Sequence, residues 1–219
     1  MGYTLNFAPI WANFGKLLWG LGLGIGLALA SVAIGAVIGL ICGFASLGPS
    51  RLARNAVSVY VAIIRNTPIL VIVLLIYFAL PQTGLVLDKN PSFILGLSVY
   101  SGAYLTEVFR SGLISVPKGV VEAARAVGLT RLQTNVYVVG PIMLRNALPA
   151  LGSTLISLFK DTSIAAAISV QELTFQARKI NVESFRVVET WSVTSAIYIA
   201  TCLVIAAGLR GLERRFPKF

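Results

Sequence analysis

The sequence has no histidine and only two cysteines among its 219 residues. Without an imidazole group, Ser–His and Cys–His catalysis and histidine-ligated metal sites are excluded. Cys42 and Cys202 lie in different apolar runs, so we interpret them as small buried hydrophobic residues and not as a disulfide. The chain also lacks a G-x-x-x-x-G-K-[ST] motif, so it has no phosphate-binding loop of that type. We expect no metal and no cofactor in this chain, and any ATP hydrolysis requires a partner.

Charged residues are scarce. They make up 12% of the chain, whereas hydrophobic residues make up 57% and the mean hydropathy is +0.85. A soluble domain carries about twice this charged fraction. Five apolar runs reach the roughly 20 residues that a membrane-spanning helix needs. The predicted spans cover residues 17–47, 57–80, 93–114, 145–171 and 188–209. Since no run alternates with a period of two, we predict an all-α membrane protein with five transmembrane helices, in a single domain of residues 1–219.

The net charge of +10 is spread unevenly between the predicted spans. When the connecting segments are taken alternately, twelve basic residues lie in or near one set and five in or near the other. Basic residues accumulate on the cytoplasmic side of membrane proteins, so we predict an external N-terminus and a cytoplasmic C-terminus. Because these residues are dispersed between spans, the excess is a topology signal and does not indicate a nucleic-acid partner.

The first predicted span is rich in glycine, and several of these residues are four positions apart. They are Gly20, Gly22, Gly24, Gly26, Gly35, Gly39 and Gly43. Small residues at this spacing let helix backbones approach each other closely. The packing partner is either another helix of the same chain or a second subunit, and the sequence leaves both alternatives open.

The second predicted span contains the segment RNTPIL, residues 65–70. Pro68 removes a backbone donor, so we expect the helix to kink or break there. Asn66 and Thr67 then have two alternative roles. Their side chains either bond to the freed carbonyl groups or face a translocation pathway.

The longest segment between spans, residues 115–141, reads as two short helices joined at a glycine. Pro117 suits a helix start, and Gly128 suits the end of the first short helix. Thr130 is a candidate N-cap for the second short helix, which we expect to end at Pro141. A connection with this much regular structure is typical of a docking element, since a simple tether is shorter.

This segment also carries a recognisable motif. It reads Glu122-Ala123-Ala124, then Gly128, then Val138-Val139-Gly140-Pro141. It resembles the cytoplasmic signature of ABC importer permeases, which is Glu-Ala-Ala, three residues, Gly, nine residues and Ile-x-Leu-Pro. Val138 and Gly140 replace the Ile and Leu, and we expect the glycine to loosen the end of the second short helix.

Five further blocks narrow the resemblance. They are RNTP (65–68), AYLTEVFRSGL (103–113), PIMLRNALPAL (141–151), LFKDTSI (158–164) and VQEL (170–173). Together with the loop motif they resemble the polar amino-acid branch, which comprises the histidine, glutamine, glutamate and arginine importers. The resemblance extends from about Leu17 to Arg215. One departure is Val120, where this branch often has Gln.

The resemblance implies the type I ABC importer permease fold in the bacterial inner membrane, with a polar amino acid moved by alternating access. It further implies a second permease subunit, identical or related, two cytoplasmic ATPase subunits that bind ATP and Mg, and an extracytoplasmic solute-binding protein. Coupling to the ATPase is then assigned to the loop. The candidate coupling residues are Glu122, Ala123, Ala124, Arg125, Gly128, Leu129 and Pro141.

Lys160 and Asp161 are the only charges between Ala150 and Val170. A charge at this depth is costly unless it is paired or faces protein or water. In one interpretation each finds a partner on another helix, such as Glu107 or Glu172 for Lys160. In the other, at least one lines the pathway, where an Asp and a Lys complement the ammonium and carboxylate of an amino acid. The candidate pathway residues are Asp161, Lys160, Thr162, Ser163, Ser157, Asn66, Thr67 and Glu107.

Two other functions fit parts of the pattern. Asp161 with Glu107 suggests the carboxylate pair of a membrane protease. Arg110 lies three residues after Glu107 on the same helix face, however, so an ion pair is the simpler interpretation. An ion-coupled secondary transporter or a channel subunit is the remaining alternative, although the absence of an internal repeat does not favour it.

Overall fold

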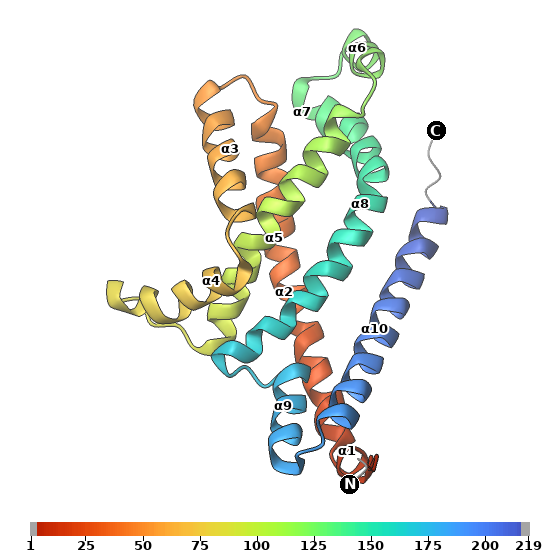
Figure 1. Ribbon diagram of the computed structural model, residues 1–219. Coiled ribbons are helices and arrows are strands. Elements are labelled where there is room, and N and C mark those ends of the chain that lie inside the picture. Colours follow the sequence, from red (N-terminus) through yellow and green to blue (C-terminus); the bar gives the residue numbers. More distant parts are fainter. Residues whose placement is uncertain (1–3, 216–219) are drawn as a thin grey trace. The chain divides into compact units, whose positions relative to one another are not determined.

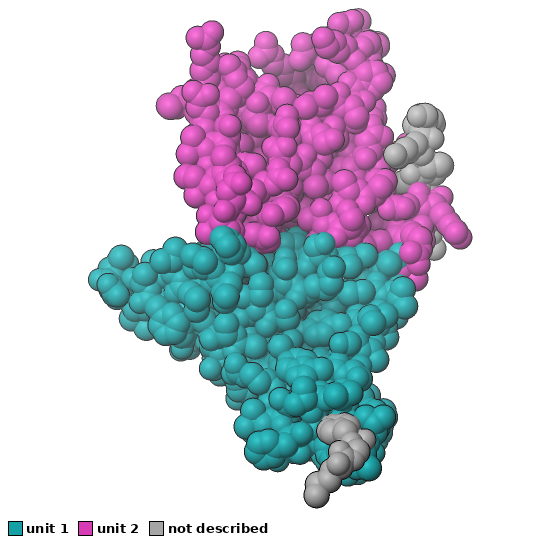
Figure 2. All heavy atoms as spheres, viewed as in Figure 1, with its two compact units in different colours: residues 1–32, 68–97, 156–206 teal, residues 33–67, 98–155, 207–219 magenta. Residues whose placement is uncertain are grey.

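The computed structural model describes residues 4–215, and within this range the chain is helical with no strand. The helices fall into two compact units. Unit 1 comprises residues 1–32, 68–97 and 156–206, and unit 2 comprises residues 33–67, 98–155 and 207–219 (Figure 2). Each unit is therefore assembled from three separate stretches of the chain. Four long helices have residues in both units, namely α2 (Phe14–Ser46), α5 (Lys89–Ile114), α8 (Gly140–Asp161) and α10 (Val187–Arg215).

Unit 1 also contains the shorter elements at the N-terminus and around the ends of the long helices (Figure 1). These are α1 (Ala8–Ala12), α4 (Ile69–Leu74), the π-helix η1 (Leu75–Ala79), the 3₁₀-helices η2 (Leu80–Thr83) and η4 (Thr162–Ile168), and α9 (Leu173–Ser184). Ile10, Leu17, Leu173, Ala177 and Ile180 form a buried core. This core fixes α9 against α1 and the first part of α2, because burial of large aliphatic side chains stabilises the packed arrangement.

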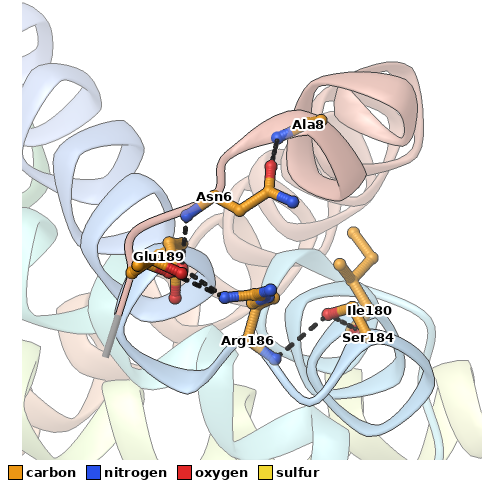
Figure 3. A network of polar contacts seen from close by, with 7 residues as sticks. Asn6, Ala8, Ile180, Ser184, Arg186 and Glu189 are labelled. Atoms are coloured by element: carbon orange, nitrogen blue, oxygen red, sulfur yellow. Dashed lines mark hydrogen bonds and ion pairs between the residues drawn. The ribbon is translucent and has the colours of Figure 1, made fainter. Parts of the chain in front are cut away.

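A polar network ties the N-terminal segment to the turn between α9 and α10 (Figure 3). The carboxylate of Glu189 is fully buried, accepts a 2.7 Å hydrogen bond from the backbone N–H of Asn6 and lies 3.6 Å from Nη1 of Arg186. Arg186 Nη1 also donates to the carbonyl of Thr4 at 2.9 Å. The hydroxyl of Ser184 accepts from the Arg186 backbone and donates to the carbonyl of Ile180. A buried carboxylate is tolerated here because its donors satisfy it.

Unit 2 contains the remaining short elements and a core of its own. Its short elements are α3 (Arg51–Arg65), α6 (Lys118–Ala126), α7 (Arg131–Thr134) and the π-helix η3 (Asn135–Val139). Leu105, Phe109, Val116, Val139 and Met143 form the buried core between α5, η3 and the start of α8. The core therefore joins the end of α5 to the segment that follows the α6–α7 turn.

The glycines of α2 face two different neighbours. A Cβ at Gly39 would lie 2.7 Å from Cβ of Leu105, and one at Gly35 would overlap the side chain of Ser101, so both glycines permit close contact with α5. A Cβ at Gly20 would lie 2.8 Å from the backbone carbon of Glu172, at the start of α9. Packing within the chain thus accounts for these positions. Gly22 and Gly26 have no neighbour within 4 Å among residues 4–215, so a subunit contact on their face stays a prediction.

Residues 4–215 contain four helices long and apolar enough to span a membrane, or five if one broken pair counts as a span. The four cover Phe14–Ser46, Lys89–Ile114, Arg131–Ile168 and Val187–Arg214. The broken pair is Arg51–Arg65 with Ile69–Thr83, where a single span over 57–80 was expected. Helix α9 lies between the fourth and fifth predicted spans, where no helix was predicted. At 12 residues it is too short to cross a bilayer.

The predicted break at Pro68 is confirmed. Helix α3 ends at Arg65 and α4 begins at Ile69. The side-chain amide of Asn66 donates to the carbonyl of Ala62 at 2.7 Å, and the hydroxyl of Thr67 donates to the carbonyl of Ile63 at 2.8 Å. Both side chains therefore satisfy carbonyl groups of the last turn, as the first of the two alternatives expected.

The turn between α6 and α7 follows the predicted residues. Gly128 has φ +90°, the N–H of Gly128 bonds to the carbonyl of Arg125, and the N–H of Leu129 bonds to that of Ala124. This is a Schellman arrangement, in which a left-handed residue closes the helix. Thr130 then caps α7 in a reciprocal pair with Gln133.

The prediction that Pro141 ends the second short helix is wrong. The helical chain continues through α7, η3 and α8, from Arg131 to Ile168. The reason lies in the π turn, where the N–H of Gly140 bonds to the carbonyl of Asn135, five residues back. The wider ladder relieves the clash that a proline ring meets in regular α-helix, so Pro141 is accommodated in the first turn of α8.

Candidate translocation site

The segment around Lys160 and Asp161 lies where α8 changes from α-helix to 3₁₀-helix. Asp161 is the last residue of α8, and η4 continues for seven residues, Thr162–Ile168. A 3₁₀ run of this length is uncommon and often marks a hinge or a strained stretch. It ends at Ser169, which is held in the left-handed region with φ 60° and accepts a 2.9 Å hydrogen bond from Nζ of Lys89. The end of η4 is therefore tied to the start of α5.

Neither charge of the predicted site is paired within unit 1. Asp161 is half-buried, and its carboxylate accepts no hydrogen bond in the part of the chain that the structure describes. Lys160 is exposed and forms no ion pair with any residue between 4 and 215. As adjacent residues on a helix, the two side chains diverge by about 100° and cannot satisfy each other well. The site thus presents one acidic and one basic group, neither of which forms an ion pair within residues 4–215.

The hydroxyl groups near Asp161 differ in their access. Ser157 is exposed and lies four residues before Asp161, on the same helix face. Ser163 is half-buried. Thr162 is 1% exposed, donates to the carbonyl of Phe159 at 2.7 Å and packs against Gly24 of α2. This placement favours a packing role for Thr162, whereas Ser157 remains accessible beside the carboxylate.

Glu172, which we considered as a partner for Lys160, is engaged elsewhere. Its carboxylate is fully buried and caps α9 by accepting 2.9 Å bonds from the backbone N–H groups of Thr174 and Phe175. It also accepts a 3.1 Å bond from the hydroxyl of Tyr198 on α10. Burial raises the pKa of Glu172 to about 7, against the lowering effect of these donors. Sequence reasoning missed this anchor because Glu is not among the preferred N-cap residues, and the available signal was only that an acidic residue is favourable near a helix N-terminus.

The other predicted residues lie in unit 2. Glu107 and Arg110 form the expected ion pair on α5, with Nη2 of Arg110 2.7 Å from Oε2 of Glu107 and Nε 3.1 Å from Oε1. The guanidinium of Arg65, at the end of α3, lies 5.2 Å from the ring centroid of Tyr104. Asn66 and Thr67 follow directly, with their side chains bonded back to α3. Residues 4–215 contain no group of three His, Cys, Asp or Glu residues able to hold a metal ion.

The predicted coupling residues lie in α6 and the turn that follows it, except for Pro141, which lies in the first turn of α8. Glu122, Ala123 and Arg125 are exposed on α6, whereas Ala124 is buried at 8% exposure. Gly128 and Pro141 are exposed, and Leu129 is half-buried. Two large apolar side chains flank the turn in the open, with Val127 80% and Leu132 73% exposed. Apolar groups left exposed together are typical of a surface that a partner covers.

The sequence matches a known family over most of its length. A family described as "Binding-protein-dependent transport system inner membrane component" matches residues 35–218. The chain is 38% identical over 212 residues to the "Glutamine transport system permease protein GlnP" of Escherichia coli K12, with 96% of this chain and 97% of that protein covered. It is 33% identical to the "Probable amino-acid ABC transporter permease protein YckA" of Bacillus subtilis, with 99% and 96% covered.

Solved structures share the architecture. A chain from the "Crystal structure of an amino acid ABC transporter with histidines" superposes with a TM-score of 0.88 at 32% identity, and the match covers 97% of this chain and all of that chain. A chain of the MetNI methionine ABC transporter in an inward-facing conformation has a TM-score of 0.77 at 22% identity, with 94% and 98% covered, so it shares the fold.

Proposed function

Because the chain belongs to the family of binding-protein-dependent transport system inner membrane components, we propose that it lines the pathway by which an ATP-driven importer moves a polar amino acid into the cell. It is a permease of the amino-acid ABC importer family, with the type I importer permease fold, and a multi-pass protein of the inner membrane. Members of this family are transport subunits and not enzymes, and the ATPase is a separate subunit.

The unpartnered carboxylate of Asp161 is the observation that carries this proposal. A half-buried acid in an apolar span is costly, and a structure keeps such a group only where it meets a partner or a hydrated path. An amino acid supplies the missing ammonium, and Lys160, one residue away, provides a cation for its carboxylate. Ser157 on the same face and the adjacent Ser163 supply hydroxyl groups, and the change to 3₁₀-helix after Asp161 gives this segment two accessible geometries for alternating access.

The α6–α7 turn is the proposed contact with the ATPase. Its exposed Val127 and Leu132 offer apolar area, and Glu122 and Arg125 add charges to the rim. The Schellman turn at Gly128 joins the two short helices through backbone hydrogen bonds. The second of them, α7, continues through η3 into α8 without a break in the helical chain. Movement at the turn is thereby connected along one helical chain to Asp161. This arrangement requires the turn and the C-terminus on the cytoplasmic side and the N-terminus outside, in agreement with the distribution of basic residues.

The proposed assembly has two permease subunits, identical or related, two ATPase subunits that bind ATP and Mg, and an extracytoplasmic binding protein. The sequence has no phosphate-binding loop, so ATP must be bound elsewhere. The exposed apolar residues of α2, including Leu29 and Ile41 at 68% and 64% exposure, provide surface for lipid or for the second subunit.

The test is uptake by proteoliposomes that contain the permease with its ATPase, with the binding protein and radiolabelled amino acids supplied outside. We expect ATP-dependent uptake, which Asp161→Asn lowers by about two orders of magnitude while the ATPase remains bound. Glu183→Gln, an exposed acid on α9, is the matched control and should leave uptake unchanged. Normal uptake by Asp161→Asn would remove the assigned role, and uptake that runs on an ion gradient without ATP would support a secondary transporter instead.

A further inference from the structure

Helix α3 turns its polar face inward and an apolar face outward, which is the reverse of an amphipathic helix in a soluble protein. Its polar stripe of Arg54, Ser58 and Arg65 lines a cavity inside unit 2. Three of its large apolar residues face outward, with Leu52 80%, Val59 57% and Ile63 59% exposed, whereas Val61 is buried on the cavity side. In a soluble protein the apolar stripe packs inward. For a helix in a membrane, this reversed arrangement indicates a hydrated cavity on the inner side and lipid or another subunit on the outer side.

The cavity has a volume of about 530 Å³ and is walled mainly by α3 and α5. Ser46 at the end of α2 contributes, as do Asn55, Ala62 and two valines of α3. Glu107 and Arg110 form the wall on α5. A volume of this size lies within the range of about 300–1,000 Å³ found for small-molecule sites, so an amino acid fits with several waters.

The charges that line the cavity are three guanidinium groups and one carboxylate. Glu107 binds Nε and Nη2 of Arg110, which leaves Nη1 of Arg110 available. Arg54 uses only Nη1, which donates to the carbonyls of Gly48 and Pro49. Arg65 packs its guanidinium plane over Tyr104, and it donates no hydrogen bond to any residue within 4–215. The cavity therefore holds a surplus of positive charge and several unused N–H donors.

We propose that this cavity is a vestibule that binds the carboxylate group of the transported amino acid, with Arg65 as the principal ligand and Glu107 as acceptor for the ammonium. The inference rests on the proposed function, because it is the transported solute that carries both groups. Arginine suits this role, since its planar fork donates two parallel hydrogen bonds to a carboxylate. Tyr104 orients the fork by stacking against it, and Arg110 neutralises Glu107 when the vestibule is empty.

The phosphate group of an anionic lipid is the alternative ligand for these donors. The lining argues against it. Only Val57, Val61 and Ala62 are apolar among the lining residues, so the cavity offers little surface to the acyl chains attached to a headgroup. The apolar residues that suit lipid chains lie on the opposite side of α3, away from the guanidinium groups.

The experiment measures binding to the permease–ATPase complex in phosphatidylcholine nanodiscs, without binding protein and without ATP. The probes are two matched pairs that differ by the carboxylate: L-arginine with agmatine, and L-glutamine with 4-aminobutanamide. We expect Arg65→Gln to raise the dissociation constants of both amino acids about tenfold and to leave those of the two amines unchanged. Arg65→Lys keeps the charge and should recover part of the affinity.

Two controls separate this site from its surroundings. Arg51→Gln removes an exposed arginine of α3 that does not line the cavity, and it should leave all four dissociation constants unchanged. The Asp161→Asn background tests independence from the other site, and the effect of Arg65→Gln should persist there. Circular dichroism and retention of the ATPase report whether each variant is folded.

If Arg65→Gln raised the dissociation constants of the amino acids and of the amines equally, the carboxylate site would be overturned. Absence of amino-acid binding to the wild-type complex would overturn it as well. A loss of affinity that appears only in nanodiscs with phosphatidylglycerol would also overturn it, in favour of a lipid headgroup. Because binding is read without ATP, these outcomes are distinct from a failure of ATP-dependent uptake, which would count against the proposed function.

Discussion

Asp161 and Glu172 stand on either side of the 3₁₀ segment η4, and the structure treats the two carboxylates in opposite ways. Glu172 is fully buried and accepts three hydrogen bonds, from two backbone N–H groups and the hydroxyl of Tyr198. Asp161 is half-buried and has no hydrogen-bond donor among the described residues. We infer that a buried carboxylate whose hydrogen-bond donors all come from the protein stabilises the fold, whereas a carboxylate without such donors can bind a ligand.

The largest difference is expected in stability. Glu172→Ala removes the cap of α9 and one of the two side-chain hydrogen-bond partners of the half-buried Tyr198 hydroxyl, the other being Thr174, which should lower the free energy of unfolding by about 3 to 4 kcal/mol. Asp161→Ala breaks no hydrogen bond in the described chain and should cost less than about 1 kcal/mol. Chemical denaturation in detergent, followed by circular dichroism, measures both. Equal losses would show that Asp161 is as structural as Glu172.

The second prediction concerns pH. Burial raises the pKa of Glu172 from 4.5 to about 7, so the native state favours the protonated acid. The stabilisation that comes from the raised pKa of Glu172 is fully present below pH 4.5, the pKa in the unfolded state. It declines as the pH rises and is lost above about pH 7, the pKa in the folded state. The loss should amount to about 2 to 3 kcal/mol between pH 4.5 and pH 7.

Glu172→Gln is the matched test of this pH effect, since the amide keeps an acceptor for the cap but does not titrate in this range. The unfolding midpoint of the wild type should fall with rising pH relative to that of Glu172→Gln. Identical pH profiles for the two proteins would exclude titration of Glu172 as the cause.

The third prediction concerns a substitution that gives the Asp161 carboxylate an ion-pair partner within the chain. Ser157→Arg places a guanidinium four residues before Asp161 on the same helix face, so the two groups can pair as Glu107 and Arg110 do. Uptake by proteoliposomes should fall about tenfold although Asp161 is retained, because the solute must then displace an internal partner. Ser153→Arg, one further turn away, is the control. A loss of uptake in both variants would mean that added charge, and not pairing, is responsible.

The sequence predicted those features that depend on residues close together in the chain. Pro68 marked the break between α3 and α4, Gly128 marked the turn after α6, and the spacing of Glu107 and Arg110 indicated an ion pair. Each follows from a local rule, such as a missing donor, a left-handed residue or a three-residue spacing on a helix.

Other features were not predicted, because they depend on distant parts of the chain or on a departure from regular α-helix. The anchoring of Glu172 requires Tyr198, which is 26 residues away, and the close approach of α9 to Gly20 of α2. The burial of Thr162 was not foreseen either: its hydroxyl donates to the carbonyl of Phe159 and its side chain is buried, and its role in the pathway stays a prediction. Pro141 was expected to stop a helix, and only the π turn before it explains why the helix continues.

The 3₁₀ geometry of η4 has a mechanical consequence for the two carboxylates. A 3₁₀-helix rises about 2.0 Å per residue and an α-helix about 1.5 Å, so seven residues span about 3.5 Å more in η4 than they would in α-helical form. One end of this stretch is held, because Ser169 is bonded to Lys89 and Glu172 is locked into α9. If η4 rewound into α-helix, the difference of about 3.5 Å would therefore appear at the other end and would shift Asp161 along the helix axis while the anchor stays in place.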